Sequence, residues 1–286
     1  MAKTVKEKTF SIQIVNIKLL SNQRGGDEAY KDIINQIHSK KISVPVKGGK
    51  HAILRTLFSD VYSYKNENTD ILYGKFSKFT VIDGKDWINL ETMDVENVDI
   101  PANKFPNLAE SDYIFIPSAH RFIIVKNTNI NVGAVETFLQ DAIKQVINSD
   151  EDFEVIIEQS EDIFEEIRNA EIVSKLLIQI SYSNADTGDD AYEFMDAQLK
   201  SAQIGRMSLD VTPDHNKNIK TDNKLISGAL EVAKSNGYAK ATIKNNGVRK
   251  KIETKQHPKI IPLKSQETLF KKTIFDTVMN LFRNSK

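Results

Sequence analysis

The sequence contains no cysteine, which excludes disulfide scaffolds, thiolate metal sites and cysteine nucleophiles. It also has no excess charge, because 39 Lys and Arg residues balance 39 Asp and Glu residues, so no global field draws the chain to nucleic acid or to a membrane. No apolar run approaches the length needed to span a bilayer, and residues 1–8 are polar and basic with no apolar segment behind them. We therefore expect a soluble cytoplasmic protein without membrane contact, in which any binding of a polyanion depends on a local patch.

Strand-forming residues are concentrated between residues 72 and 126. The segment 73–82 has the β-branched and aromatic content of a strand, Asp83-Gly84 follows as a turn signal, and Trp87 begins the predicted return strand. Trp87 is the one tryptophan of the chain, and we expect it to be buried in this strand pair. The continuous apolar run 122–125 predicts a further strand that is buried on both faces.

Helices and strands alternate after residue 130. Asn131 predicts the N-cap of a helix whose apolar residues recur at helical spacing through residue 147, and Ser265 predicts the cap of a final amphipathic helix. Asn246-Gly247 between two alternating segments predicts a β-hairpin. The pattern favours an α+β fold in which a strand-rich N-terminal part (1–130) packs with a helix/strand-alternating C-terminal part (131–286), as two parts or as one cooperative domain.

Two basic segments are candidates for binding nucleic acid. Lys47 and Lys50 flank a Gly-Gly pair whose backbone could approach a phosphate closely, although the P-loop pattern is absent and a plain polar turn also accounts for the segment. Arg249, Lys250 and Lys251 lie on the second strand of the predicted hairpin, where cations can neutralise phosphates without reading bases. Lysines on an edge strand also protect it from aggregation, which is the structural alternative.

One set of residues suits a metal-independent nuclease. His51 and Arg55 would share a face if their stretch is helical, and His120 and Arg121 stand at the start of a buried strand. Together these side chains would supply general acid–base catalysis with cationic stabilisation, provided that the two segments converge in space. The histidines show no paired metal spacing, so no metal site and no cofactor is predicted from them.

A second set suits a metal-dependent nuclease. Asp214, followed by Glu253 and Lys255 on the predicted hairpin, has the order in which carboxylates hold Mg²⁺ and a lysine positions the attacking water. The pattern is short enough to arise by chance. A separate acidic loop suits either a divalent cation or the cap of the following helix, and it comprises Asp186, Asp189 and Asp190.

Several short segments, taken together, resemble a bacterial family known as domain of unknown function 4747. Besides the N-terminal strand they are the segments 48–51, 73–76, 100–101, 105–108, 115–117, 120–122 and 235–238. Members of this family look like components of mobile-element and antiviral-defence loci. The resemblance implies a setting in phage defence, and it carries over no catalytic residue.

The leading hypothesis is a bacterial antiviral-defence protein that binds nucleic acid or a phage component. Whether the chain is an enzyme stays open. A nuclease effector is the first alternative, and a non-catalytic assembly subunit that docks through its C-terminal helix is the second. The partners considered are nucleic acid, a phage protein, a partner protein of the defence system and a second copy of the chain. No cofactor is expected, apart from Mg²⁺ for the metal-dependent nuclease.

Overall fold

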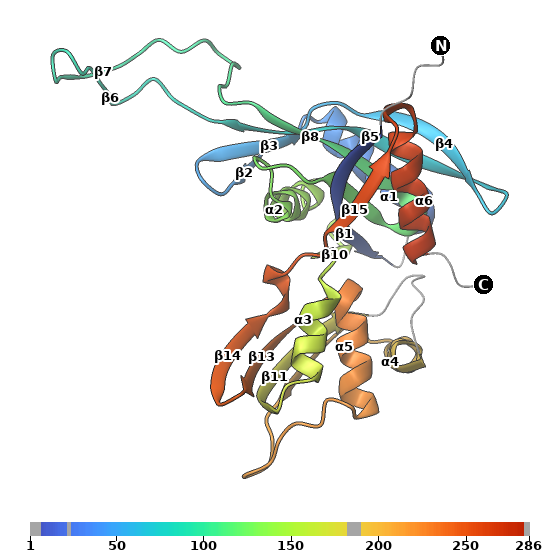
Figure 1. Ribbon diagram of the computed structural model, residues 1–286. Coiled ribbons are helices and arrows are strands. Elements are labelled where there is room, and N and C mark those ends of the chain that lie inside the picture. The colour runs from blue at the N-terminus through green and yellow to red at the C-terminus, as the bar shows by residue number, and fades with distance from the viewer. Residues whose placement is uncertain (1–6, 22–23, 182–189, 283–286) are drawn as a thin grey trace.

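A computed structural model describes residues 7–21, 24–181 and 190–282, and it has an α+β fold built on two separate antiparallel sheets (Figure 1). The larger sheet has nine strands, with the order β10-β1-β9-β8-β5-β3-β2; β15 pairs with β1, and β4 pairs with β5. Its strands are β1 (Lys8–Leu20), β2 (Val44–Val46), β3 (Lys50–Leu54), β4 (Phe58–Tyr64), β5 (Glu67–Thr80), β8 (Ala109–Ile116), β9 (Arg121–Val125), β10 (Asp152–Ile157) and β15 (Ile261–Ser265). The predicted fold class is confirmed.

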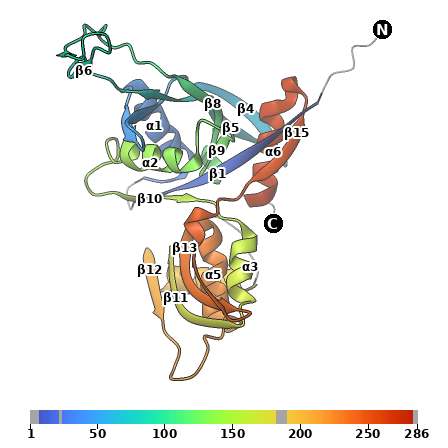
Figure 2. The ribbon, with the colours of Figure 1, turned by 60° about the vertical axis from the view of Figure 1, so that its left-hand side comes forward.

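Helices cover both faces of the larger sheet. The side chains of β1 alternate, so that Ile12 and Ile14 face helix α6 (Phe270–Phe282), whereas Val15 and Ile17 face the core beneath α1 (Gly26–Ser39) and α2 (Val132–Ile143). Figure 2 shows α1 and α2 on one side of the sheet and α6 on the other. The run 122–125 is therefore buried on both faces as its composition predicts, with only its last residue partly exposed.

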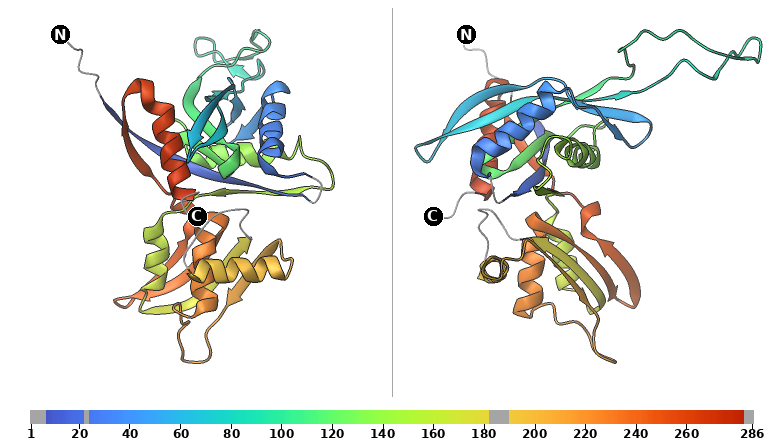
Figure 3. Two further views of the ribbon diagram at one scale, coloured as in Figure 1. Left: turned by 90° about the vertical axis from the view of Figure 1, so that its right-hand side faces the viewer. Right: turned by 180° about the vertical axis from the view of Figure 1, so that it is seen from behind.

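The smaller sheet has helices on one face only. Its order is β12-β11-β13-β14, and its strands are β11 (Ile172–Ser181), β12 (Arg206–Val211), β13 (Gly237–Asn245) and β14 (Val248–Glu253). Helices α3 (Glu161–Arg168), α4 (Asp190–Ser201) and α5 (Lys224–Asn236) supply the other layer of its core. No described helix covers the opposite face, which points away from α3, α4 and α5, to the left in Figure 1 and to the right in the right-hand view of Figure 3.

The smaller sheet and its helices are inserted between two neighbouring strands of the larger sheet. The chain leaves after β10 and returns before β15, and both of these strands pair with β1. The two connections lie side by side, because Gln159 forms a β-bridge with Pro258 and the amide of Ser160 donates to the carbonyl of His257 at 2.8 Å. The predicted division after residue 130 stays a prediction about cooperative units; strand pairing runs across that position, since β10 belongs to the larger sheet.

Residues 81–108 form an arm that projects far from the larger sheet (Figure 1). The arm carries only a two-stranded ribbon, β6 (Trp87–Ile88) and β7 (Val95–Glu96). The expectation that Trp87 is buried is wrong, because its side chain is 41% exposed and its indole N–H donates to the carbonyl of Asp83 within the arm. The sequence predicts a return strand at residue 87, whereas the strand that returns along β5 after the arm is β8.

Caps and turns follow the sequence closely, with one displacement. The side chain of Asn131 accepts a hydrogen bond from the amide of Ala134 at 2.7 Å, as expected of an N-cap. The hairpin at Asn246-Gly247 joins β13 to β14. The expected cap at Ser265 is wrong: this residue ends strand β15 opposite Lys8, and short 3₁₀ turns occur at Glu267–Leu269, as also at Pro117–Ala119 and Thr254–Gln256.

Helix α6 packs within the chain through most of its apolar stripe, including Ile274, Phe275 and Val278. Only Leu281 of its large apolar side chains is strongly exposed in the described range, with Leu269 in the preceding turn. None of the helices in residues 7–21, 24–181 and 190–282 has the length and apolar character needed to cross a membrane.

Candidate nucleic-acid interface

The uncovered face of the smaller sheet is rich in cations, and we call it the open basic face. Alternation along β11, β13 and β14 turns small and aliphatic side chains toward the helices and longer polar ones away from them. The strand register places Lys175, Thr242 and Lys251 in one row, and Leu177, Lys240 and Glu253 in the next. The basic side chains on this face are Lys175, Lys240, Lys244, Arg249 and Lys251.

Most of these cations lack an acidic partner among the described residues. Lys240 is the exception, because its ammonium lies 2.6 Å from the carboxylate of Glu253, and this hydrogen bond lowers the pKa of Glu253. Lys250, which the sequence grouped with its two neighbours, points to the other side of β14 and pairs with Glu166 of α3 at 2.6 Å. Four cations of the open basic face therefore remain available to an anionic ligand.

The open basic face is hollowed at two places. A concavity of about 480 Å³ lies over the middle of the sheet, and it is lined by Lys175, Leu177, Lys240, Ala241, Thr242, Lys251, Ile252, Glu253 and Gln256. A smaller one, of about 200 Å³, lies where the face meets β10 of the larger sheet. The face thus continues into the junction between the two sheets.

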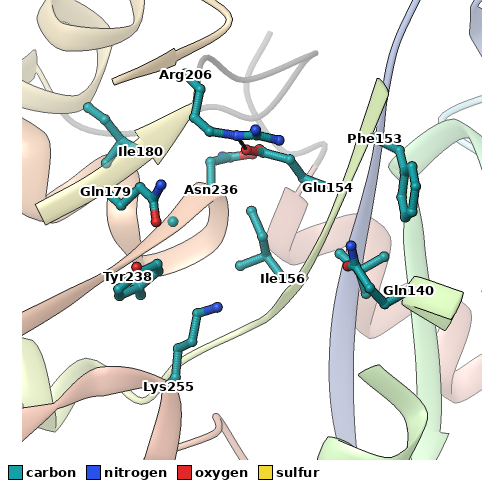
Figure 4. Close-up of a pocket in the computed structure, with 12 residues that line it drawn as sticks. Gln140, Phe153, Glu154, Ile156, Gln179, Ile180, Arg206, Asn236, Tyr238 and Lys255 are labelled. Atoms are coloured by element: carbon teal, nitrogen blue, oxygen red, sulfur yellow. Dashed lines mark hydrogen bonds and ion pairs between the residues drawn. The ribbon is translucent and has the colours of Figure 1, made fainter. Parts of the chain in front are cut away.

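The junction cavity has an aromatic side and an ion-paired side (Figure 4). On one side the ammonium of Lys255 lies 4.4 Å from the ring centre of Tyr238, a cation–π contact. On the other, Arg206 forms an ion pair with Glu154, and this hydrogen bond raises the pKa of Arg206. Amide side chains from α2 and β11 complete the polar lining, with Gln140 opposite Gln179 in Figure 4.

Lys47 and Lys50 lie elsewhere, at the turn between β2 and β3 of the larger sheet. Gly48 and Gly49 have φ values of 87° and 66°, so the turn needs glycine for its backbone conformation. The polar-turn interpretation explains both glycines without a ligand. These two lysines do not join the open basic face.

The two histidine segments do not converge. His51 pairs with Phe79 near one end of β5, whereas Phe122, which follows the His120–Arg121 pair, lies level with Leu72 near the middle of the same strand. Phe79 and Leu72 are about 23 Å apart along β5. Strand β3, which carries His51, and strand β9, which carries Arg121, are also three strand spacings apart in the sheet. His51 is also on a strand, so it does not share a helical face with Arg55, which pairs with Glu110.

Arg121 is a buried structural residue. Its guanidinium lies 2.9 Å from the carboxylate of Glu158 and donates to the side-chain oxygen of Asn16 at 2.7 Å, and both members of the ion pair are almost fully buried. Phe282 of α6 covers the guanidinium at 4.2 Å. The side chain of Asn16 donates in turn to that of Asn236 in α5 at 3.0 Å, so the network ties the larger sheet to the inserted unit.

His120 occupies the left-handed region, with a φ of 55°, after the 3₁₀ turn Pro117–Ala119. Its ring stacks on that of Tyr30 with 4.2 Å between centres. This position directs the ring toward α1, whereas the guanidinium of Arg121 contacts Asn16 of β1 and Glu158 at the end of β10. The two neighbours therefore serve different contacts.

The residues of the metal-dependent set are also apart. Glu253 on β14 lies in the same row as Asp210 on β12, three strand spacings or about 14 Å away, and Asp214 is in an exposed loop beyond Asp210. Lys255 turns to Tyr238 at the junction. Within the described residues, no group of three or more His, Asp or Glu side chains is placed to hold a metal ion. Asp186 and Asp189 lie outside the described residues, as does the side chain of Asp190.

Sequence reasoning found Arg249 and Lys251 but missed Lys175. The signal was present, because Leu176, Ile178 and Ile180 share the inward face of β11, which places Lys175 on the outward one. What the sequence could not show is that β11 pairs directly with β13.

Comparison with known proteins identifies the family of this chain. A family profile described as "Domain of unknown function (DUF4747)" matches residues 8–280, which include both sheets. No curated protein matches the chain significantly. Since the profile spans nearly all of the chain, from β1 into α6, the protein belongs to the DUF4747 family.

Proposed function

We propose that this protein binds nucleic acid through the open basic face. The observation that carries the proposal is the group Lys175, Lys244, Arg249 and Lys251, which has no acidic partner among the described residues and lies on a sheet face without a helical cover. Cations on such a face can follow a phosphate backbone without reading base sequence. A chain with no net charge needs a local patch of this kind to hold a polyanion.

Single-stranded nucleic acid suits this surface best. Tyr238 lies on the outward side of β13, at the edge of the junction cavity, where a base could stack on its ring. Lys255 beside the ring would follow the backbone of the same strand. The bacterial antiviral-defence setting belongs to the proposal as well, and its support is the family resemblance.

Fluorescence polarisation with labelled single- and double-stranded RNA and DNA tests the proposal. The face variant Lys175→Glu/Arg249→Glu/Lys251→Glu should lose most of its affinity, and its salt slope should fall by about one for each phosphate contact removed. The matched control Lys47→Glu/Lys50→Glu carries its cations on the other sheet and should bind as the wild type does. Wild-type affinity in the face variant, or loss only in the control, would remove the open basic face from the site.

Running the same assay with Mg²⁺ and with EDTA, and scoring cleavage, separates a binding module from a nuclease. Within each of the two candidate nuclease sets the residues lie too far apart to act together, and this favours binding without cleavage. Cleavage that survives in the face variant would place a catalytic site elsewhere in the chain.

A further inference from the structure

The arm, residues 81–108, exposes an unusual amount of apolar surface. Near its tip Ile88, Leu90, Met93 and Val95 are between 57% and 79% exposed. Along its length further large apolar side chains are exposed by more than a third, namely Val81, Trp87, Val98, Phe105 and Leu108. Monomeric proteins rarely expose contiguous apolar surface of this kind unless it is an interaction site.

The arm is nevertheless ordered by its own hydrogen bonds. The amide of Val98 donates to the carbonyl of Gly84 at 2.7 Å, and the amide of Asn89 donates to the carbonyl of Asp94 at 2.9 Å. The backbone approach at Gly84 is so close that a Cβ there would lie 2.0 Å from the carbonyl oxygen of Val98. A two-stranded ribbon is only marginally stable alone in water. An ordered ribbon with exposed apolar side chains therefore suggests that the arm packs against another protein surface.

The charge of the arm indicates which surface that is. The arm carries six acidic residues (Asp83, Asp86, Glu91, Asp94, Glu96 and Asp99) against two basic ones (Lys85 and Lys104). The open basic face has the opposite charge, and its larger concavity includes an aliphatic side chain, Leu177, among the cations. An acidic, apolar ribbon and a basic concavity with an aliphatic floor are complementary in both respects.

We propose that the arm of one copy docks on the open basic face of a second copy, and that the exchange is reciprocal. The arm and strands β13 and β14 lie on the same side of the molecule in Figure 1 and in the right-hand view of Figure 3, so a two-fold axis on that side can bring each arm over the other copy's sheet. A two-fold arrangement makes the contact twice, which doubles the buried area, and it closes the assembly at a dimer.

Arm docking has a consequence for ligand binding, which rests on the proposed function. The same cations would contact the partner's arm in the dimer and phosphates in a nucleic-acid complex. The two states therefore exclude each other, and the arm acts as an acidic competitor of nucleic acid.

A charge exchange tests the contact directly. In the arm variant Glu91→Lys/Asp94→Lys/Glu96→Lys, a basic arm meets a basic face. In the face variant, Lys175→Glu/Arg249→Glu/Lys251→Glu, an acidic arm meets an acidic face. Light scattering coupled to gel filtration should give a dimer for the wild type and a monomer for each variant alone, and an equimolar mixture of the two variants should restore a dimer. In the mixed dimer each arm again meets a face of opposite charge.

An apolar variant, Leu90→Ser/Met93→Ser/Val95→Ser, should be monomeric and should still unfold cooperatively, because these side chains contribute to no core of the described protein. It should also bind single-stranded nucleic acid more tightly than the wild type at concentrations where the wild type is dimeric. A monomeric wild type, or a dimer that survives both charge variants, would overturn arm exchange. If the mixture restores the dimer but the wild type binds no nucleic acid, arm exchange is supported and the proposed function is overturned.

Discussion

Tyr238 allows a test of how the open basic face recognises its ligand. Its ring borders the junction cavity, and the ammonium of Lys255 makes a cation–π contact with one face of the ring. Replacement of a stacking aromatic by alanine costs about 1–3 kcal/mol of binding free energy for each base. We expect Tyr238→Ala to weaken single-strand binding by that amount, with little change for duplex, whereas Tyr238→Phe keeps the affinity. Equal losses for single strand and duplex would show that the ring positions the backbone instead.

Arg121 should prove essential for stability rather than for binding. Removal of one member of a buried ion pair leaves the other charge unpaired and typically costs about 3–5 kcal/mol. Arg121→Met should therefore lower the free energy of unfolding by that amount in urea denaturation, and Arg121→Met/Glu158→Met should recover part of the loss. A stable Arg121→Met protein that loses ligand binding would return this residue to the functional site.

Glu151 links stability to pH. The guanidinium of Arg24 donates to its carboxylate and lowers its pKa from 4.5 to about 2. A carboxyl group with a depressed pKa in the folded state stabilises the protein above its unfolded pKa, and this contribution is lost as the pH falls from about 4.5 through about 2. We expect Arg24→Met to be destabilised at neutral pH and to approach the wild type in acid. A difference in unfolding free energy that stays constant across the titration would contradict this linkage.

At the scale of single elements, replacing a large side chain by alanine should change the unfolding free energy far less in the arm than in the core. Trp87 is held only within the arm, so Trp87→Ala should change the unfolding free energy of the monomeric apolar-arm variant by less than about 1 kcal/mol. Phe138 of α2 is fully buried, and Phe138→Ala should cost about 3–5 kcal/mol. Thermal melts of both variants measure the contrast. A large loss at Trp87 would mean that the arm packs on the body of its own chain.

Elements with local signals could be predicted from the sequence, and those that depend on a distant partner could not. Helix α2 has its cap at Asn131, and the hairpin β13–β14 has its turn at Asn246-Gly247. Strand β15 contains Pro262 and resembles a loop in the sequence, because its pairing with β1 joins residues about 250 positions apart. The sequence predicts a return strand at Trp87, within the arm, because the turn signal and the composition there are typical of a hairpin, and nothing local shows that β8 is the strand that pairs with β5 after the arm.

The same limit applies to the candidate site. Arg249 and Lys251 stood out as a cluster along the chain, whereas Lys175 joins them only through the pairing of β11 with β13. Arg121 and His51 looked equally promising in the sequence. The structure distinguishes them by burial, because Arg121 is almost fully buried beneath Phe282 of α6, whereas His51 is partly exposed. The sequence alone shows neither position.

At the scale of the whole molecule, the inserted unit should fold by itself. Its hydrophobic core is formed by residues between 163 and 252, and the cores of the larger sheet contain none of them in the described chain. Its two ends are already side by side at the bridge between Gln159 and Pro258. A fragment of residues 160–257 should therefore melt cooperatively, and it should keep most of the single-strand affinity because it carries the open basic face.

A fragment of residues 160–236 is the matched control, since it lacks β13 and β14, leaves one edge of β11 without its strand partner and loses the core side chains of both missing strands. The contacts that the longer fragment loses include the buried network, in which Asn16 of the larger sheet meets Asn236, and the ion pair of Arg206 with Glu154. These contacts join the larger sheet to the inserted unit and lie outside the hydrophobic core of the unit, so the fragment can lose them and keep its core. If residues 160–257 prove unfolded while the full chain is stable, the network and not the core sets cooperativity, and the molecule is one folding unit despite its two sheets.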